Sequence, residues 1–319
     1  MYKELLFKKY HTLIFICFVY VCFSAQKIIA RQEDEDKKPS AIDVAAKTVL
    51  YLEFEQQVSE ITEINGTKVE CDLYLKVPGR EVYSPKKIRI AGTGFLIKSD
   101  EIPYVVTAKH IVKNDKSFGH YWISPIEGDI LSGTFDDVRT KLNGAKWFFH
   151  KDADIAIHPI TFIRRGYEYR LIPKDMFSNN PLELLTLVCV VGFPHMLGKD
   201  NIRLGPLVTT CDITSWPAIL PSNPNTKVIF LSKRLAMGYS GAPVYSIQDP
   251  PSRGIFRGAH TMKLIGIQSG TFLFPVQAQG TVVTQDEFSY IVPTSYLIEL
   301  LNSNEVQEFE QNISTKKKD

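Results

Sequence analysis

The decisive stretch of the chain is Gly238-Tyr239-Ser240-Gly241-Ala242-Pro243, in which a serine lies between two glycines. Glycine adopts backbone angles that other residues avoid, so a tight turn at this point would expose the Ser240 hydroxyl. Such a turn would also aim two backbone N–H groups at a point beside the hydroxyl, which is what an oxyanion hole requires. A serine hydroxyl is by itself a weak nucleophile, so the chain must also supply a base and a carboxylate.

A histidine and an aspartate that suit these roles precede the serine. Residues 107–110, Thr-Ala-Lys-His, follow the apolar run at 104–106. Residues 152–157, Asp-Ala-Asp-Ile-Ala-Ile, lie between that histidine and the serine. The chain therefore offers His110 as the base and an aspartate, at 152 or 154, as the carboxylate.

The chain order histidine, aspartate, serine, with these flanking residues, resembles that of the trypsin-like (chymotrypsin-fold) serine proteases, and in particular a divergent, bacterial-type member. The motifs of that family are Thr-Ala-Ala-His, Asp-Ile-Ala-Leu and Gly-Asp-Ser-Gly-Gly-Pro, and the matching positions here are His110, Asp154 and Ser240. Asp154 directly precedes the apolar run, as the family's aspartate does, and is therefore preferred to Asp152. The resemblance extends from about residue 92 to residue 298.

This resemblance implies an all-β fold of two antiparallel six-stranded β-barrels with a C-terminal helix, and an active site in the cleft between the barrels. The sequence agrees, because short runs rich in β-branched and aromatic residues alternate with turn residues. Only the end of the chain has a helical pattern, with Thr294 as the N-cap and apolar residues at 297, 298, 300 and 301. The candidate strands are residues 48–55, 68–77, 87–98, 104–106, 121–123, 147–150 and 155–160 in the first half, and 184–191, 202–213, 228–231, 242–247, 262–268 and 288–292 in the second.

The resemblance also implies a role for each catalytic group. Ser240 would attack a carbonyl carbon, His110 would take its proton, and Asp154 would hold the imidazole in the correct tautomer. The backbone N–H groups of Gly238 and Ser240 would form the oxyanion hole. Tyr239 stands where animal members of the family carry an aspartate that pairs with a newly cut N-terminus, so activation by that route is not expected.

In the same family, the stretch just before the serine turn lines the specificity pocket. Here that stretch is residues 232–237, and Arg234 at the base of the pocket would favour an acidic substrate side chain. Ser269 and Gly270 would form the opposing wall. The alternative is that Arg234 points to solvent, with no effect on specificity.

The chain divides into four segments. Residues 1–25 are predicted to be a secretory signal, because a lysine-containing start precedes an apolar run at 13–23 that is too short for a stable membrane span. Residues 26–43 are predicted to be a disordered linker, since they are charged and poor in apolar side chains. A trypsin-like protease domain would occupy residues 44–308, and a polar tail residues 309–319. A secreted or periplasmic location follows from the signal.

Composition excludes several classes of partner. The formal net charge is +2 with both signs mixed along the chain, so no basic face for nucleic acid is indicated. The histidines lack metal-binding spacing, and no metal or other cofactor is expected. Once the signal is removed, Cys71, Cys189 and Cys211 remain, and either a Cys189–Cys211 bridge or three free thiols is compatible with the sequence. The sequence does not indicate an oligomeric state.

The favoured function is that of a secreted serine endopeptidase, which hydrolyses protein or peptide substrates through a Ser-His-Asp triad and an acyl-enzyme. One alternative is a catalytically silent binding module that keeps the protease fold, since fold does not determine function. A second is a serine esterase of the α/β-hydrolase kind. That class needs the elbow Gly-x-Ser-x-Gly and the order serine, aspartate, histidine, and Ala242 interrupts the elbow here.

Overall fold

A computed structural model of the protein describes most of the chain after residue 44. The described residues are 45–57, 59–64, 67–72, 74–76, 83–85, 87–99, 102–112, 119–123, 131–161, 171–178, 183–194, 205–247, 262–278 and 281–316. The predicted signal (1–25) and the predicted linker (26–43) lie outside the described residues. Among the helices of the described part, each falls short of the length and apolarity that crossing a membrane requires.

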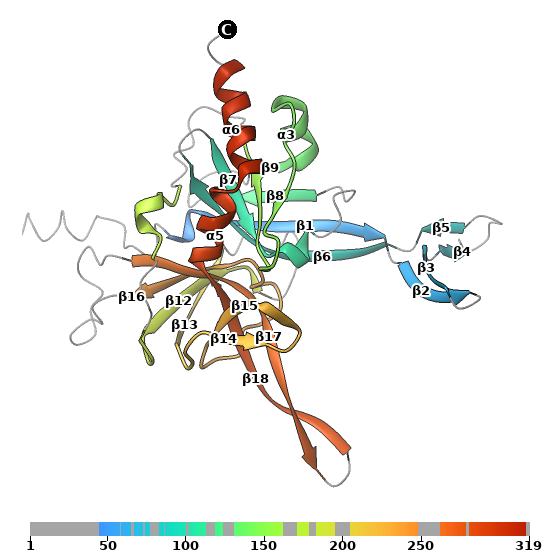
Figure 1. The fold of residues 1–319 in the computed structure, drawn as a ribbon, viewed down its shortest axis with the longest axis vertical. Coiled ribbons are helices and arrows are strands. Elements are labelled where there is room, and N and C mark those ends of the chain that lie inside the picture. Colours follow the sequence, from blue (N-terminus) through green and yellow to red (C-terminus); the bar gives the residue numbers. More distant parts are fainter. Residues whose placement is uncertain are drawn as a thin grey trace, which may run out of the picture.

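The first large sheet contains seven antiparallel strands and holds the histidine and aspartate segments (Figure 1). A short 3-10 helix, η1 (Lys109–Ile111), follows strand β7 (Pro103–Thr107), and helix α3 (Phe135–Lys141) follows strand β9 (Leu131–Thr134) with a capping box at Thr134. The strands of this first sheet, in spatial order, are β10 (Phe148–Phe149), β11 (Ala156–Pro159), β7 (Pro103–Thr107), β6 (Lys87–Lys98), β1 (Val49–Gln57), β8 (Gly119–Ile123) and β9 (Leu131–Thr134).

The second large sheet also has seven antiparallel strands and carries the serine turn at the start of β16. The short 3-10 helix η2 (Lys174–Met176) precedes this sheet in the chain. The strands of this second sheet, in spatial order, are β13 (Leu207–Asp212), β12 (Leu187–Gly192), β16 (Pro243–Ile247), β17 (Met262–Ala278), β18 (Thr281–Pro293), β15 (Asn223–Phe230) and β14 (Ala218–Leu220).

Two small hairpins project from the first sheet beyond the ends of β1 and β6 (Figure 1). One pairs β2 (Ser59–Ile64) with β3 (Thr67–Asp72), and the other pairs β4 (Tyr74–Lys76) with β5 (Tyr83–Pro85). The far ends of β17 and β18 form a third projecting hairpin, below the second sheet in the same view.

The structure is mostly β, as expected, but the number of strands differs from the expected two six-stranded barrels. Each large sheet has seven strands in the described residues, and the pairings leave two edge strands in each instead of closing a barrel. The expected strand at 68–77 does not join the first sheet, because its described parts, β3 and β4, pair locally in the small hairpins. The first sheet instead contains β9, which was not predicted from the sequence. In the second sheet, the additional strand is β14, which folds back onto β15 through a two-residue turn.

A continuous apolar core joins the two sheets and supports the site. It includes Phe95, Val106 and Ile157 from the first sheet and Val191 and Tyr245 from the second. A smaller core lies within the second sheet and contains Val190, Val244 and Ile291. Burial of a large apolar side chain contributes about 1.5–3 kcal/mol, so a contact surface of this kind fixes the relative position of the two sheets.

The chain ends in two helices. Helix α5 (Thr294–Leu301) begins at Thr294, whose hydroxyl donates to the Leu264 carbonyl instead of capping the helix as predicted. Helix α6 (Asn304–Lys316) includes residues 309–316, which the sequence analysis assigned to a polar tail. This helix buries Phe309 and Ile313 against the larger core, and its Glu310 carboxylate accepts a 2.6 Å hydrogen bond from the Ser99 hydroxyl.

Cys189 and Cys211 are both free and buried. Cys189 on β12 is paired with Thr210, and Cys211 on β13 is paired with Val188. Since successive residues of a strand point to opposite faces of the sheet, this offset of one residue directs the two thiols apart. The Cys189–Cys211 bridge that the sequence allowed is therefore absent.

Candidate active site

The serine turn depends on glycines at both sides. Gly238 and Gly241 have φ angles of +99° and +86°, in the left-handed region that side chains with a Cβ rarely adopt. A Cβ added to Gly241 would overlap the Thr93 carbonyl oxygen and the Thr107 hydroxyl. The turn is therefore built to lie directly against two strands of the first sheet.

Thr93 on β6 anchors this turn to the first sheet. Its backbone N–H donates to the Ser240 carbonyl over 2.8 Å, and its hydroxyl donates to the Gly238 carbonyl over 2.8 Å. The same hydroxyl accepts a 3.0 Å hydrogen bond from the Phe193 amide, and the Thr93 carbonyl accepts one of 2.8 Å from Thr107. Because Thr93 is fully buried, these bonds are shielded from water and hold the turn beside the segment that leads to His110.

His110 and Asp154 form a two-pronged pair. The His110 ring Nδ1 lies 2.7 Å from one carboxylate oxygen of Asp154, and the His110 backbone N–H donates to the other over 2.9 Å. The pair forms because β7 and β11 are neighbouring strands, with Thr107 opposite Ala156. The segment that follows Thr107 and the segment that precedes Ala156 therefore meet at the same end of the two strands. With Nδ1 facing the carboxylate, the His110 proton lies on Nδ1 and Nε2 is left as an acceptor.

The electrostatics of the pair favour an ionised carboxylate. Burial raises the pKa of Asp154, but the hydrogen bond from the His110 ring and its charge outweigh burial, and Ser269 adds to the effect. The pKa of Asp154 is therefore held below its usual value. His110 remains accessible, since 44% of its side chain is exposed.

Asp152, the competing carboxylate, faces a different neighbour. One of its side-chain oxygens lies 3.4 Å from the Asn225 amide nitrogen, and its carbonyl accepts a 2.9 Å hydrogen bond from Asn223. Both asparagines belong to β15. Of the two candidate aspartates, Asp154 is thus the one beside His110.

The Ser269 hydroxyl donates a 2.5 Å hydrogen bond to the Asp154 oxygen that also faces the His110 ring. From the sequence, Ser269 was expected in the wall of a specificity pocket, and its contact with Asp154 was not predicted. The contact coincides with a β-bulge in β17, where the register shifts between Gln268 and Gly270. Bulges turn a side chain away from the regular alternation, and this irregularity carries no sequence signal of its own.

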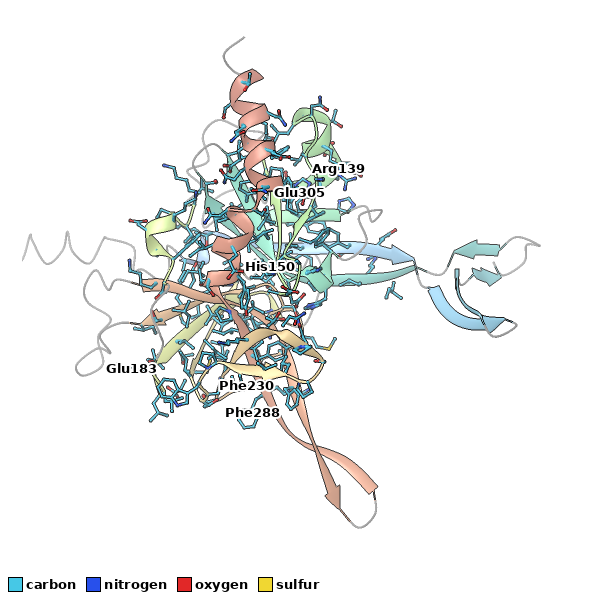
Figure 2. All side chains as sticks on the ribbon, viewed as in Figure 1. Arg139, His150, Glu183, Phe230, Phe288 and Glu305 are labelled. Carbon is cyan, nitrogen blue, oxygen red and sulfur yellow. The ribbon has the colours of Figure 1, made fainter. Side chains whose placement is uncertain are left out.

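His150 is a second contributor that the sequence analysis missed. Its ring Nδ1 accepts hydrogen bonds from the amides of Asp152 (3.2 Å) and Ala153 (2.8 Å), so it shapes the loop that presents Asp154. Its carbonyl accepts a 2.9 Å hydrogen bond from the Lys109 ammonium, next to His110 in the chain. The ring lies beside α5 and its Nε2 is 3.3 Å from Glu299 (Figure 2).

The Ser240 hydroxyl lies in the adjacent turn. Within the described residues this hydroxyl makes no hydrogen bond, so Ser240 and the His110 ring are not bonded in this structure. Catalytic hydrogen bonds are often long before substrate binds and shorten in the complex. The backbone contact with Thr93 nevertheless holds the serine against β6, which pairs with β7, the strand that leads to His110.

The two predicted oxyanion donors are available. Within the part of the chain that the structure describes, neither the Gly238 nor the Ser240 amide donates a hydrogen bond. The next two amides are hydrogen-bonded: the Gly241 N–H donates to the Gln268 carbonyl over 2.7 Å, and the Ala242 N–H donates to the Tyr239 carbonyl over 2.8 Å. The turn therefore presents two unused N–H groups on either side of Tyr239.

Tyr239 fastens the turn to the second sheet. Its side chain is almost fully buried, and its hydroxyl lies 2.9 Å from the Thr209 hydroxyl and 3.5 Å from the Leu207 carbonyl, both on β13. Burial raises the pKa of Tyr239 despite the opposing hydrogen bond with Thr209, so the phenol stays protonated. An uncharged hydrogen bond here occupies the position where animal relatives have an aspartate.

The remaining predicted site residues are more dispersed. Arg234 is exposed, and Gly270 lies against Tyr290, since a Cβ at Gly270 would come within 2.6 Å of the Tyr290 hydroxyl. Among the described residues, no three histidine, cysteine or acidic side chains gather as a metal site would require.

Comparisons with known proteins give one family match and several similar solved structures. Residues 92–249 match the family model of the trypsin-like peptidase domain. No curated protein matches the chain. Solved structures that resemble it include Deg5, at 13% identity and a TM-score of 0.43, covering 84% of this chain and 92% of that chain.

Two further solved structures are similar to the chain at comparable levels. The active form of the Rv3671c protease from M. tuberculosis matches at 15% identity and a TM-score of 0.44, covering 82% of each chain. An inactivated protease paralogue of the scabies mite matches at 13% identity and a TM-score of 0.44, covering 85% of this chain and 96% of that chain. From the family match, the chain carries a trypsin-like peptidase domain that spans at least residues 92–249.

Proposed function

We propose that the protein is a secreted serine endopeptidase that hydrolyses peptide bonds through Ser240, His110 and Asp154. The observation that carries the proposal is the 2.7 Å contact between His110 Nδ1 and Asp154, beside a serine turn that is bonded to β6. The peptidase family match supports a peptide as the substrate class.

In the proposed mechanism, the His110 Nε2 takes the Ser240 proton as the serine oxygen attacks the scissile carbonyl carbon. The imidazolium that forms is stabilised by the ionised Asp154. It then gives its proton to the leaving amine, and an acyl-enzyme remains on Ser240. A water molecule, deprotonated by His110, attacks this ester, and collapse of the second tetrahedral intermediate returns the proton to Ser240.

The uncommitted amides of Gly238 and Ser240 would stabilise the negative oxygen of both tetrahedral intermediates. One such donor contributes about 3 kcal/mol to transition-state stabilisation. Because these donors are held by the turn itself, they need no rearrangement during the reaction.

A fluorophosphonate probe with intact-mass detection tests the proposal. We expect rapid single modification of the wild-type protein, loss of modification in Ser240→Ala, and strongly slowed modification in His110→Ala. Cleavage of a peptide library by the same preparation identifies an endopeptidase. Folded wild-type protein that neither reacts with the probe nor cleaves any peptide contradicts the proposal.

A catalytically silent binding module is the second candidate function. The observation that favours it is the Ser240 hydroxyl, which makes no hydrogen bond to His110 among the described residues. In that case the probe leaves the folded wild-type protein unmodified. A serine esterase would instead react with the probe and cleave esters but leave peptides intact.

Secretion is a separate part of the proposal and rests on residues 1–25. We expect a mature protein that begins close after Ala25 when the chain is produced in a host with a secretory route. Mass determination of the exported protein measures this start. Recovery of the full-length chain from the cell interior alone contradicts secretion.

A further inference from the structure

Gln268 on β17 has an uncommitted polar atom next to the serine turn. The residue is only 3% exposed, and its side-chain Nε2 donates to the Gly270 carbonyl over 3.3 Å. Its side-chain oxygen Oε1 has no hydrogen-bond partner among the described residues. Since the atom that faces a carbonyl must be the donor, the free atom is the acceptor.

An unpaired buried acceptor is costly. Leaving such an atom without a partner destabilises a protein by about 1–3 kcal/mol, and most buried polar atoms are paired for this reason. A group that donates to Oε1 when it binds would recover this free energy. The atom is therefore a candidate for recognition of a bound molecule.

Gln268 lies directly beside the proposed nucleophile. Its carbonyl accepts the 2.7 Å hydrogen bond from Gly241, and its own amide donates to the Ala242 carbonyl over 2.9 Å. These two bonds continue the pairing of β16 with β17 up to the serine turn. A substrate residue held at Ser240 would thus be close to Gln268.

The side chain of Gln268 lies on the face of the sheet that the segment before the serine covers. Gln268 is directly opposite Ile291 on β18, so the two side chains share a face. Ser289, two residues before Ile291, shares that face as well, and its hydroxyl accepts a 2.8 Å hydrogen bond from the Leu235 amide. Residues 231–235 therefore lie along the same face as the Gln268 side chain.

Ser269, the next residue along β17, points away from the Gln268 side chain. Its hydroxyl donates to the Asp154 carboxylate, which also bonds His110. Because neighbouring residues of a strand point to opposite faces, β17 directs Ser269 toward Asp154 and Gln268 to the other face of the sheet. The two neighbouring residues would then serve catalysis and substrate choice separately.

We propose that Gln268 selects the substrate residue on the acyl side of the scissile bond and favours a carboxamide side chain, such as that of glutamine. This inference rests on the proposed endopeptidase function. The free Oε1 of Gln268 accepts a hydrogen bond from the NH2 group of the substrate side chain. The second N–H of Gln268 Nε2 donates to the oxygen of that side chain, so the two carboxamides form a pair of hydrogen bonds. A charged side chain would be disfavoured, because burying it beside a neutral amide costs more than the hydrogen bond returns.

This specificity differs from the acidic preference that Arg234 suggested from the sequence. Arg234 is exposed, so solvent and salt would screen its attraction for an acidic side chain. Gln268, by contrast, is buried where a hydrogen bond discriminates strongly. A single peptide panel separates the two hypotheses, because glutamine and glutamate have nearly the same shape.

The test compares three peptides that differ only in the residue before the cut: glutamine, glutamate or leucine. For the wild-type protein we expect kcat/KM for the glutamine peptide to exceed that for the leucine and glutamate peptides by about tenfold or more. In Gln268→Met, which keeps the length of the side chain, the ratio of glutamine to leucine should fall to about one or below. The ratio is measured within one preparation and so does not depend on the fraction of active protein.

Gln307→Met is the matched control, since Gln307 lies on α6 and, among the described residues, its side chain bonds only the Leu301 carbonyl. It should keep the wild-type ratio. Wild-type protein that cleaves the leucine peptide as well as the glutamine peptide overturns the role of Gln268 while the endopeptidase function stands. A preference for glutamate also overturns it, in favour of Arg234. Absence of both peptide cleavage and fluorophosphonate labelling is instead a failure of the proposed function.

Discussion

The Ser269 hydroxyl and the His110 ring meet the same carboxylate oxygen of Asp154, at 2.5 Å and 2.7 Å. Asp154 is thus held from both sheets at once, by β17 of the second sheet and by η1 of the first. An aspartate fixed in this way cannot rotate without losing two hydrogen bonds. Orientation of the histidine therefore depends on contacts across the two halves of the domain.

Replacement of Ser269 by alanine should lower kcat/KM by about tenfold, because a hydrogen bond to a charged group contributes about 1.5–3 kcal/mol. Removal of this donor should also raise the pKa of Asp154 toward its usual value. The measurement is peptide hydrolysis, with Ser314→Ala on α6 as the control. Full activity in Ser269→Ala would show that the contact does not position the aspartate.

The loop that carries Asp154 should depend on the acceptor at His150. His150→Leu leaves the buried Ala153 amide without a partner, and we expect kcat to fall by about tenfold or more with a smaller change in KM. His150→Asn keeps a side-chain oxygen close to the position of Nδ1 and should retain most of the activity. Equal losses in the two variants would mean that the shape of the ring, and not its acceptor, holds the loop.

The hydrogen bond between Tyr239 and Thr209 should set the rate at which Ser240 reacts. Tyr239→Phe and Thr209→Val each remove this bond, and each should slow fluorophosphonate labelling several-fold. Because both changes remove one shared interaction, the double variant should react about as slowly as either single variant. Effects that add fully would show that the two side chains act independently.

His158 should make the fold sensitive to acid. It is completely buried on β11, its Nδ1 donates to the Pro159 carbonyl, and burial, aided by the charge of Arg139, lowers its pKa from 6.5 to about 3. The unfolded chain binds the proton more readily than the folded protein, so stability is full above pH 6.5. Below that value the free energy of unfolding should fall by about 1.4 kcal/mol per pH unit as the pH approaches 3.

His158→Asn keeps a donor for the Pro159 carbonyl but removes the titrating group. Urea unfolding at pH 7 and pH 5 measures the effect. The difference between the two pH values should shrink by about 2 kcal/mol in the variant, whatever its absolute stability. An unchanged difference would place the acid sensitivity in the carboxylates.

The sequence was sufficient to predict which residues lie together where their positions follow from the pairing of neighbouring strands. His110 and Asp154 flank neighbouring strands, so the motif and the local pattern were enough to bring them together. The contact of Ser269 with Asp154 depends on a bulge, and the role of His150 depends on a loop conformation. Neither has a sequence signature, which is why both were missed.

Other differences had signals that were present in the sequence. The apolar residues of α6 at 306, 309 and 313 recur at helical spacing, but charged neighbours made the segment look like a tail. The separation of Cys189 and Cys211 required the register of β12 with β13, because a shift of one residue reverses which faces they share. The strands β9 and β14 are too short, at four and three residues, to show an alternating pattern.

The position of Thr93 has a consequence for how the protein fails. The hydroxyl and the amide of this one residue, from the N-terminal half, hold the carbonyls on both sides of Tyr239 in the C-terminal half. If the halves part, through heat or through a cut in a connecting loop, the proposed nucleophile loses its scaffold in the same event. Separation of the two halves would therefore abolish the proposed activity, and neither half alone would retain it.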